Sequence, residues 1–418
     1  MSKNSTPWIQ TVTLTPPSLK DNTADADRLI QALKSRLDTP VIDIDLDLLK
    51  ILPAVLRHSR FNIRCILFKE KQHWVLTGIT DAKDATLIAG LAIDLGTTRV
   101  VLRLLDLATG RTLAESAFDN PQEVIGPDIL ARIHFAEKEN GLKKLNKLII
   151  SGLNNVDVGT NAEVVLGNEN WLIACAGAAG PALESSVTRM GMTAGPGVID
   201  RIAVEPDTLE FNTHIIDDLP PKGICGSGVI DLAARLFLTG MIDIQGNLVA
   251  AVCGPKIKEI DGLLHLVVVP AEKTATGFDL TISQADLDSL IRSKAAMYTI
   301  LETLTDSVGI TPQDLESFFV AGTFGASINP ESAISIGMLP DLPLDRYKPL
   351  GNSSLGGATL ALQSDKYHPE IGQIRDRITY MELNVNQNFM NRFSAAKFLP
   401  HTNTSLFPSV KLWDKRKQ

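Results

Sequence analysis

The spacing of apolar and polar positions predicts a small α+β domain at the start of the chain. A helix follows the capping residue Asn22 or Thr23, with apolar positions at Leu29, Ile30, Leu33 and Leu37. Residues 43–59 predict a second short helix, and residues 61–70 and 72–80 predict paired strands. We expect residues 1–20 to form an extended linker and residues 21–88 a small domain without visible chemistry.

The pattern changes at residue 89 to strands joined by tight turns. Residues 91–95 form an apolar strand, residues 99–107 a second strand, and residues 111–119 a third strand beyond a turn at 108–110. A helix is predicted from Pro127, since proline is well tolerated at the first helical position. Its predicted buried face consists of Ile129, Leu130, Ile133 and Ala136.

One short pattern, an apolar strand ending in Asp-x-Gly-Thr, occurs twice. It reads "IDLGTT" at residues 93–98 and "VDVGTN" at residues 156–161, and each copy opens a hairpin. The second hairpin covers residues 162–176 and turns at Gly167 and Asn168. Two copies of one strand–loop–hairpin unit indicate two similar half-domains.

The chemistry of these loops suits a polyphosphate with a metal ion. Glycine lets backbone N–H groups approach a phosphate closely, and threonine hydroxyls add donors. Carboxylates orient the water shell of Mg²⁺. A single such loop is more often an ordinary turn, but two copies favour a clamp. The predicted phosphate loops are Asp94, Gly96, Thr97 and Thr98, and Asp157, Gly159, Thr160 and Asn161, with Asp94 and Asp157 holding Mg²⁺ through water.

Three further segments allow both a binding role and a structural role. Gly322, Thr323, Phe324 and Gly325 follow an apolar strand, where glycines let a flat ring or a phosphate lie against the backbone; the alternative is a strand-to-helix turn. Gly226, Ser227 and Gly228 open a helix whose N-terminus suits an anion, or else the glycines serve close packing. Lys294 lies beside the apolar stripe Leu287, Leu290, Ile291 and Leu301 of a helix that starts near Gln284. It either reaches a nucleotide or directs its charge to solvent.

Composition narrows the class of protein. The 418 residues include 40 basic and 48 acidic side chains, a net charge of −8 without blocks of like charge, which argues against nucleic acid or an anionic membrane as the partner. The start of the chain lacks a signal-peptide core, and no apolar run approaches the ~20 residues of a membrane helix, so a cytoplasmic protein is expected. Four dispersed cysteines predict buried free thiols, and His134 and His214 predict solvated or satisfied side chains.

The two loops and the later "AGTFG" resemble the ASKHA fold of actin, hexokinase and heat-shock ATPases, an α/β duplicated ribonuclease H-like architecture, here over residues 89–410. The chain is similar within that superfamily to reductive activases of corrinoid proteins. The matching stretches are "LAIDLGTTRV", "NPQEVIGPDILARI", "VDVGTNAEVVLG", "AAGPALE", "PPKGICGSGVIDLAARL", "FVAGTFGASINPESAISIGMLP", "GNSSLGGA" and "FLPHTNTSLFPS". The lead-in "LTPPSLKDNTADADRL" and the domain after it resemble the linker and middle domain of the family.

The resemblance also implies an enzymatic activity. Activases of this family couple ATP binding and hydrolysis to reduction of a corrinoid protein from Co(II) to Co(I), with ATP and Mg²⁺ as cofactors. By position, Gly322 to Gly325 would lie near adenosine. Family members begin with a [2Fe–2S] domain ahead of this lead-in. The present chain has no cysteine cluster, so an external ferredoxin-like donor is expected, and a homodimer is one option for assembly.

The first half-domain is expected to be shortened. Asp94 and Asp157 are only 63 residues apart, and we count three strands before the second loop, fewer than a half-domain of the superfamily has. Two other functions stay open: a non-catalytic ATP-binding scaffold that docks a corrinoid protein, and a small-molecule kinase of the same fold. A kinase needs a general base near the γ-phosphate, for which no clear candidate is visible.

Overall fold

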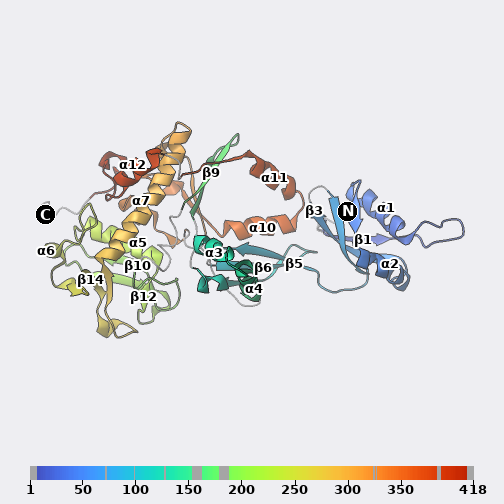
Figure 1. Cartoon of the computed structure of the whole chain (residues 1–418), viewed down its shortest axis with the longest axis horizontal. Coiled ribbons are helices and arrows are strands. Elements are labelled where there is room, and N and C mark those ends of the chain that lie inside the picture. Colours follow the sequence, from blue (N-terminus) through green and yellow to red (C-terminus); the bar gives the residue numbers. More distant parts are fainter. Residues whose placement is uncertain are drawn as a thin grey trace. The chain divides into compact units, whose positions relative to one another are not determined.

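The computed structural model describes residues 7–70, 73–97, 99–126, 129–152, 162–177, 188–322, 325, 327–383 and 387–411 (Figure 1). The chain divides into two compact units. Unit 1 contains residues 1–125, 134–159 and 354–373, and unit 2 contains residues 126–133, 160–353 and 374–418. Because the chain passes between the units several times, segments distant in sequence meet inside each of them.

Unit 1 begins with a four-stranded sheet in the order β1-β3-β4-β2. The elements are β1 (Ile9–Thr13), α1 (Asp25–Leu37), β2 (Ile42–Ile44), α2 (Leu46–His58), β3 (Asn62–Glu70) and β4 (His73–Asp81). Alternate residues of β3 are buried, and the helices contribute Leu29, Leu33, Leu52 and Leu56 to the same core. The two helices and the strand pair predicted from the sequence are confirmed.

A three-stranded antiparallel sheet follows, made of β5 (Ala89–Leu95), β6 (Arg99–Asp106) and β7 (Thr112–Asp119). Helix α10 (Ser353–Gln363) packs on one face, and α4 (Gly141–Gly152) packs on the other (Figure 1). The Asp106 carboxylate accepts from the Ala108 N–H at 2.9 Å and from the Thr109 hydroxyl at 2.6 Å, which closes the predicted turn. These three strands are the ones described between residues 89 and 152, the number counted in the sequence.

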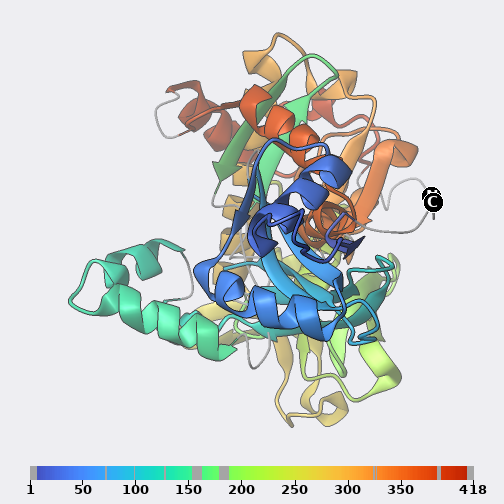
Figure 2. The ribbon, with the colours of Figure 1, turned by 90° about the vertical axis from the view of Figure 1, so that its right-hand side faces the viewer.

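Helix α3 (Ile129–Ala136) lies where a helix was predicted, and α4 follows it after a short turn (Figure 2). Its predicted buried face is wrong at Ile133, whose side chain is exposed. Arg132 is buried instead and donates its Nε–H to the Gly126 carbonyl at 2.8 Å. The guanidinium satisfies a carbonyl of the turn that leads into the helix, so the arginine rather than the isoleucine points inward.

Unit 2 contains the largest core, built around two three-stranded sheets and two helices. Its elements include β10 (Val198–Val204), β11 (Phe211–Ile215), β12 (Gly223–Ile224), α5 (Gly226–Leu238), α6 (Ala250–Cys253), β13 (Ile257–Ile260), β14 (Leu263–Val269), β15 (Leu280–Ser283), α7 (Gln284–Ser307) and α9 (Pro330–Ser335). Ser283 and Asp286 cap the start of α7 reciprocally. The apolar stripe predicted for α7 is buried and confirmed: Leu287, Leu290, Ile291 and Leu301.

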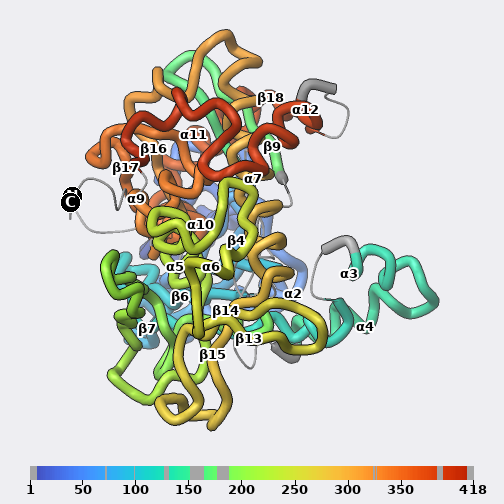
Figure 3. Tube along the Cα trace, turned by 90° about the vertical axis from the view of Figure 1, so that its left-hand side faces the viewer, coloured from blue at the N-terminus to red at the C-terminus, as the bar shows by residue number. Residues whose placement is uncertain are grey.

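The remaining strands of unit 2 form two small sheets. The predicted hairpin is present as β8 (Ala162–Gly167) and β9 (Leu172–Gly177), with β18 (Ile378–Tyr380) parallel to β9. Helix α12 (Gln387–Ala396) packs on α7 nearby (Figure 3). Strands β16 (Phe318–Ala321) and β17 (Tyr347–Gly351) pair in parallel, and the first of them confirms the apolar strand predicted before the Gly322 loop.

The four cysteines are free and buried, as predicted. Burial raises the pKa of the Cys65 thiol to about 12 and that of Cys175 to about 11, so both are protonated, unreactive core side chains. None of the helices in the described part of the chain combines the length and the apolar character that a membrane crossing requires.

Candidate nucleotide site

The first phosphate loop closes the hairpin between β5 and β6. The Gly96 N–H donates to the Arg99 carbonyl at 2.9 Å, and the Gly96 carbonyl accepts from the Asn120 side-chain amide, also at 2.9 Å. Asn120 is buried and uses its side-chain oxygen to accept from the Gln122 N–H at 3.0 Å. Asn120, which the sequence did not single out, thus holds the peptide group that follows the glycine in place.

Asp94 lies on the face of the sheet that α10 covers. It is directly opposite Val101 in the β5–β6 register, and Ala92 precedes it by two positions. Ala92 and Val101 are buried against Leu355 of α10, and residues two apart on a strand share a face. The half-buried Asp94 carboxylate is therefore on the α10 side, at the end of the strand that leads into the loop.

Two glycines in the first turns of α10 border open space. A side chain placed at Gly356 or Gly357 would meet no atom within 4 Å. The N-terminal N–H groups of an α-helix have no partner within the helix and attract anions. The stretch "GNSSLGGA" contributes to the family resemblance but was not predicted to be part of the site. The available signal was a pair of glycines just after two serines that follow a strand.

Arg103 fastens α10 to the sheet. Its guanidinium donates to the Thr359 hydroxyl at 3.0 Å and binds Glu115 through Nε and Nη2, each at 2.8 Å. The Thr359 hydroxyl in turn donates to the Leu355 carbonyl at 2.7 Å. The middle of α10 is thus tied to β6, the strand that leaves the first phosphate loop.

In unit 2, two parallel strands end at a glycine loop. The Gly322 N–H donates to the Gly351 carbonyl at 2.7 Å, and both glycines have positive φ, 93° and 63°. Ligands of parallel sheets bind beyond the carboxyl ends of the strands, where these glycines lie. Gly325 packs so tightly on Val320 that an added Cβ would come within 2.6 Å of a Val320 methyl group. Strand β17 leads within two residues into α10.

The start of α5 serves close packing. Gly226, Ser227 and Gly228 are buried, and the Ser227 hydroxyl donates to the Asp200 carbonyl at 3.1 Å. A Cβ at Gly228 would lie 2.7 Å from the Ile199 carbonyl oxygen. The packing interpretation is confirmed, because only glycine lets α5 approach β10 this closely. A nucleotide contact at this helix start stays a prediction.

Lys294 has neither of the two roles expected for it. Its side chain is fully buried, and its ammonium donates to the Phe398 carbonyl at 2.6 Å and the Pro400 carbonyl at 2.8 Å. The charge therefore neither faces solvent nor is free to bind a nucleotide. It instead attaches the C-terminal segment to α7. The acceptors come from more than 100 residues away, so helix periodicity could not reveal them.

The two isolated histidines behave as predicted. His214 places Nδ1 2.5 Å from an Asp200 carboxylate oxygen, and the His134 side chain is 76% exposed. Among the described residues, no group of three His, Cys, Asp or Glu side chains is arranged to hold a metal ion.

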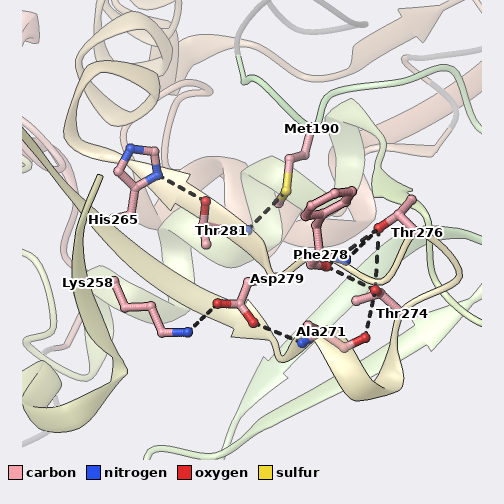
Figure 4. Close-up of polar contacts among 9 residues, drawn as sticks. All are labelled: Met190, Lys258, His265, Ala271, Thr274, Thr276, Phe278, Asp279 and Thr281. Atoms are coloured by element: carbon pink, nitrogen blue, oxygen red, sulfur yellow. Dashed lines mark hydrogen bonds and ion pairs between the residues drawn. The ribbon is translucent and has the colours of Figure 1, made fainter. Parts of the chain in front are cut away.

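A second polar cluster, on the β13–β15 sheet, is structural (Figure 4). The Asp279 carboxylate accepts from Lys258 and from the Ala271 N–H, and the Lys258 ammonium is the main reason that the pKa of Asp279 is lowered. Met190 accepts from the Thr281 N–H at 3.0 Å beside a small cavity, which has no charged side chain in its lining. These contacts hold the loop before β15 in place and offer no reacting group.

Several predicted residues lie outside the described part of the chain: Thr98, Asp157, Gly159, Thr160, Asn161, Thr323 and Phe324. The second phosphate loop is among them. The clamp between two facing loops, and the Mg²⁺ site shared by Asp94 and Asp157, therefore stay predictions.

Three family models match the chain. They are described as the C-terminal domain of RACo, the ASKHA domain, over residues 154–411, the RACo middle region over 89–169, and the RACo linker region over 4–84. The family divides the chain between residues 84 and 89, near the expected boundary at 88. It counts the small α+β domain as part of its linker and the first phosphate loop as part of its middle region.

Two curated relatives and one solved structure agree with these models. The chain is 31% identical to the "Corrinoid activation enzyme RamQ" of Eubacterium limosum, over 57% of this chain and 41% of that protein. It is 25% identical to the "[Co(II) methylated amine-specific corrinoid protein] reductase" of Methanosarcina barkeri, over 56% of this chain and 44% of that protein. The chain thus spans less than half the length of each curated relative.

The solved structure is a "Reductive activator for corrinoid,iron-sulfur protein". It superimposes with a TM-score of 0.85 at 29% identity and covers 98% of this chain and 82% of that one. With the model for the ASKHA domain matching 258 residues, 154 to 411, the α/β ASKHA fold is established. The chain belongs to the RACo family and contains its linker, middle and ASKHA regions.

Proposed function

We propose that this protein uses ATP to drive reduction of a corrinoid protein from Co(II) to Co(I) in the cytoplasm, with the electron supplied by a separate ferredoxin-like iron–sulfur protein. Its relatives, a corrinoid activation enzyme and a corrinoid protein reductase, support the reaction class. One electron passes from the reduced donor to cobalt, and ATP is hydrolysed to ADP and phosphate in the same cycle.

The observation that carries the nucleotide part is the position of Asp94 relative to α10. A carboxylate at a strand end lies on the sheet face covered by a helix whose first turns contain two glycines with open space. A polyphosphate fits beside such a helix start, because its charge is attracted by the positive end of the helix dipole. Asp94 would bind the hydrated Mg²⁺ that accompanies the phosphates, and Asp157 would provide the second carboxylate.

The state of the thiols is compatible with a separate electron donor. A [2Fe–2S] cluster needs closely placed thiolates, whereas the four cysteines are buried and free. The described residues contain no metal-binding group of three His, Cys, Asp or Glu side chains. In this proposal the electron enters through a partner and leaves to the corrinoid, while this chain binds both the nucleotide and the acceptor protein.

An omission series tests the proposal. The purified chain is mixed with a Co(II) corrinoid protein, a reduced ferredoxin-like donor and Mg·ATP, and the absorbance of Co(I) is followed. We expect Co(I) only in the complete mixture, together with release of ADP. Equal Co(I) formation without ATP or without the chain would contradict the proposal. Binding of ATP without turnover would favour the scaffold, and a phosphorylated small molecule would favour the kinase.

A further inference from the structure

The C-terminal end of α10 is held by the linker region of the family, residues 4–84. The indole N–H of Trp8 donates to the Leu362 carbonyl, one of the last four carbonyls of the helix. Those carbonyls have no partner within an α-helix, so the indole serves as a cap from a distant part of the chain. The Trp8 ring also lies 5.5 Å from the ring of His368, the second residue of the next helix, α11 (Tyr367–Arg377).

Trp8 is itself rigidly placed. Its side chain is 3% exposed and belongs to the core of the linker region. Its ring lies 5.7 Å from Trp74 and 6.4 Å from Phe68, both on strands of the four-stranded sheet. A second contact joins the linker region to the segment after α10, because the Lys69 ammonium pairs with the Asp365 carboxylate at 3.4 Å.

The two ends of α10 thus meet different regions of the chain. Its first turns face the Asp94 side of the β5–β7 sheet, and its last turn, where Leu362 packs on the same sheet, contacts the linker region as well. An α-helix of 11 residues is about 16 Å long and stiff, so fixing one end sets the position of the other. A displacement at Leu362 would move Gly356 and Gly357 relative to Asp94.

We propose that Trp8 is a positioning residue for nucleotide binding, acting through α10, so that the linker region supports the nucleotide site. This inference rests on the proposed function. Since coupling between sites is reciprocal, bound Mg·ATP stabilises the contact between Trp8 and Leu362. The alternative is a passive junction, in which the linker packs on α10 without affecting the nucleotide.

The test compares Trp8→Phe with Trp74→Phe in the full chain. Both substitutions keep an aromatic ring in the same core, but only the first removes the hydrogen bond to Leu362. We expect Trp8→Phe to raise the Kd for Mg·ATP about five- to tenfold and to speed hydrogen exchange of residues 358–363, while Trp74→Phe stays within about twofold. In the unsubstituted chain, Mg·ATP should slow exchange of residues 7–13.

A surface substitution keeps the proposal testable if Trp8→Phe does not fold. Asp365→Asn removes the ion pair with Lys69 without touching the core, and should raise the Kd about two- to threefold; Asp345→Asn, an exposed aspartate, is its control. Wild-type affinity for Mg·ATP in both Trp8→Phe and Asp365→Asn would overturn this inference but leave the proposed function intact. Hydrogen exchange at residues 7–13 that Mg·ATP does not change would have the same consequence. A chain that does not bind Mg·ATP at all would instead overturn the proposed function, and this inference with it.

Discussion

The side-chain amide of Asn120 donates to the Gly96 carbonyl over 2.9 Å and so fixes the loop that follows Asp94. The same side chain accepts from the Gln122 N–H through its oxygen at 3.0 Å. The two functions can be separated chemically, because aspartate keeps the acceptor oxygen and loses the donor.

Asn120→Asp should therefore weaken nucleotide binding while preserving the turn at Gln122. We expect the Kd for Mg·ATP to rise about tenfold and the free energy of unfolding to fall by about 1–2 kcal/mol, as expected when a buried carbonyl loses its donor. Titration calorimetry and urea unfolding measure the two effects. Asn168→Asp, in the β8–β9 turn, is the matched control and should bind as the wild type does. Unchanged affinity in Asn120→Asp would show that the loop does not need this bond.

The contact between Arg103 and Thr359 should appear as an energetic coupling. A double-mutant cycle with Arg103→Ala and Thr359→Val isolates their interaction, and we expect a coupling of about 0.5–1.5 kcal/mol in the free energy of unfolding. Hydrogen exchange of residues 353–359 should speed up in each single variant. Strictly additive losses would mean that the guanidinium does not hold α10.

Lys294→Met tests the corrected role of this lysine. The substitution leaves the Phe398 and Pro400 carbonyls without their donor, so the free energy of unfolding should fall by about 2–4 kcal/mol. Exchange of residues 398–411 should become faster. The Kd for Mg·ATP should stay within about twofold, as in the exposed control Lys273→Met. A well-folded Lys294→Met chain with strongly reduced affinity would restore the nucleotide contact expected from the sequence.

Asp231 gives a pH-dependent prediction. Its side chain is 5% exposed on α5, and burial raises the pKa of this carboxyl above the ordinary value of 3.8. Between the unfolded and folded pKa values the folded state binds more protons, so this group lowers stability as the pH rises through that window. Asp231→Asn removes the effect and should be more stable than the wild type near pH 7, but not near pH 3.5. Urea unfolding across this range measures it, with exposed Asp207→Asn as the control, and a pH-independent difference would contradict it.

Local patterns were sufficient for much of the fold. The spacing of the apolar residues within α7 predicts its buried stripe. The turn between β6 and β7 is predicted by its own residues, because Asp106 and Thr109 hydrogen-bond within it. Each of these elements depends on residues within a few positions of one another. The first phosphate loop could be proposed for the same reason.

The parts that escaped sequence reasoning depend on distant partners. Thr359 meets Arg103 across 256 positions, and Leu362 meets Trp8 across 354. Lys294 finds its two acceptors more than 100 residues away. No periodicity within one element encodes such pairs, so α10 could not be placed beside Asp94 before the fold was known.

The central claim is that Asp94 and the start of α10 bind Mg·ATP, and a calorimetric titration of the full chain tests it most directly. The wild type should bind one Mg·ATP per chain, and so should the control Asp119→Asn, which changes an exposed aspartate at the end of β7, with the same Kd. Asp94→Asn should bind Mg·ATP at least tenfold more weakly. Equal Kd values for all three proteins, or no binding by the wild type, would contradict the account.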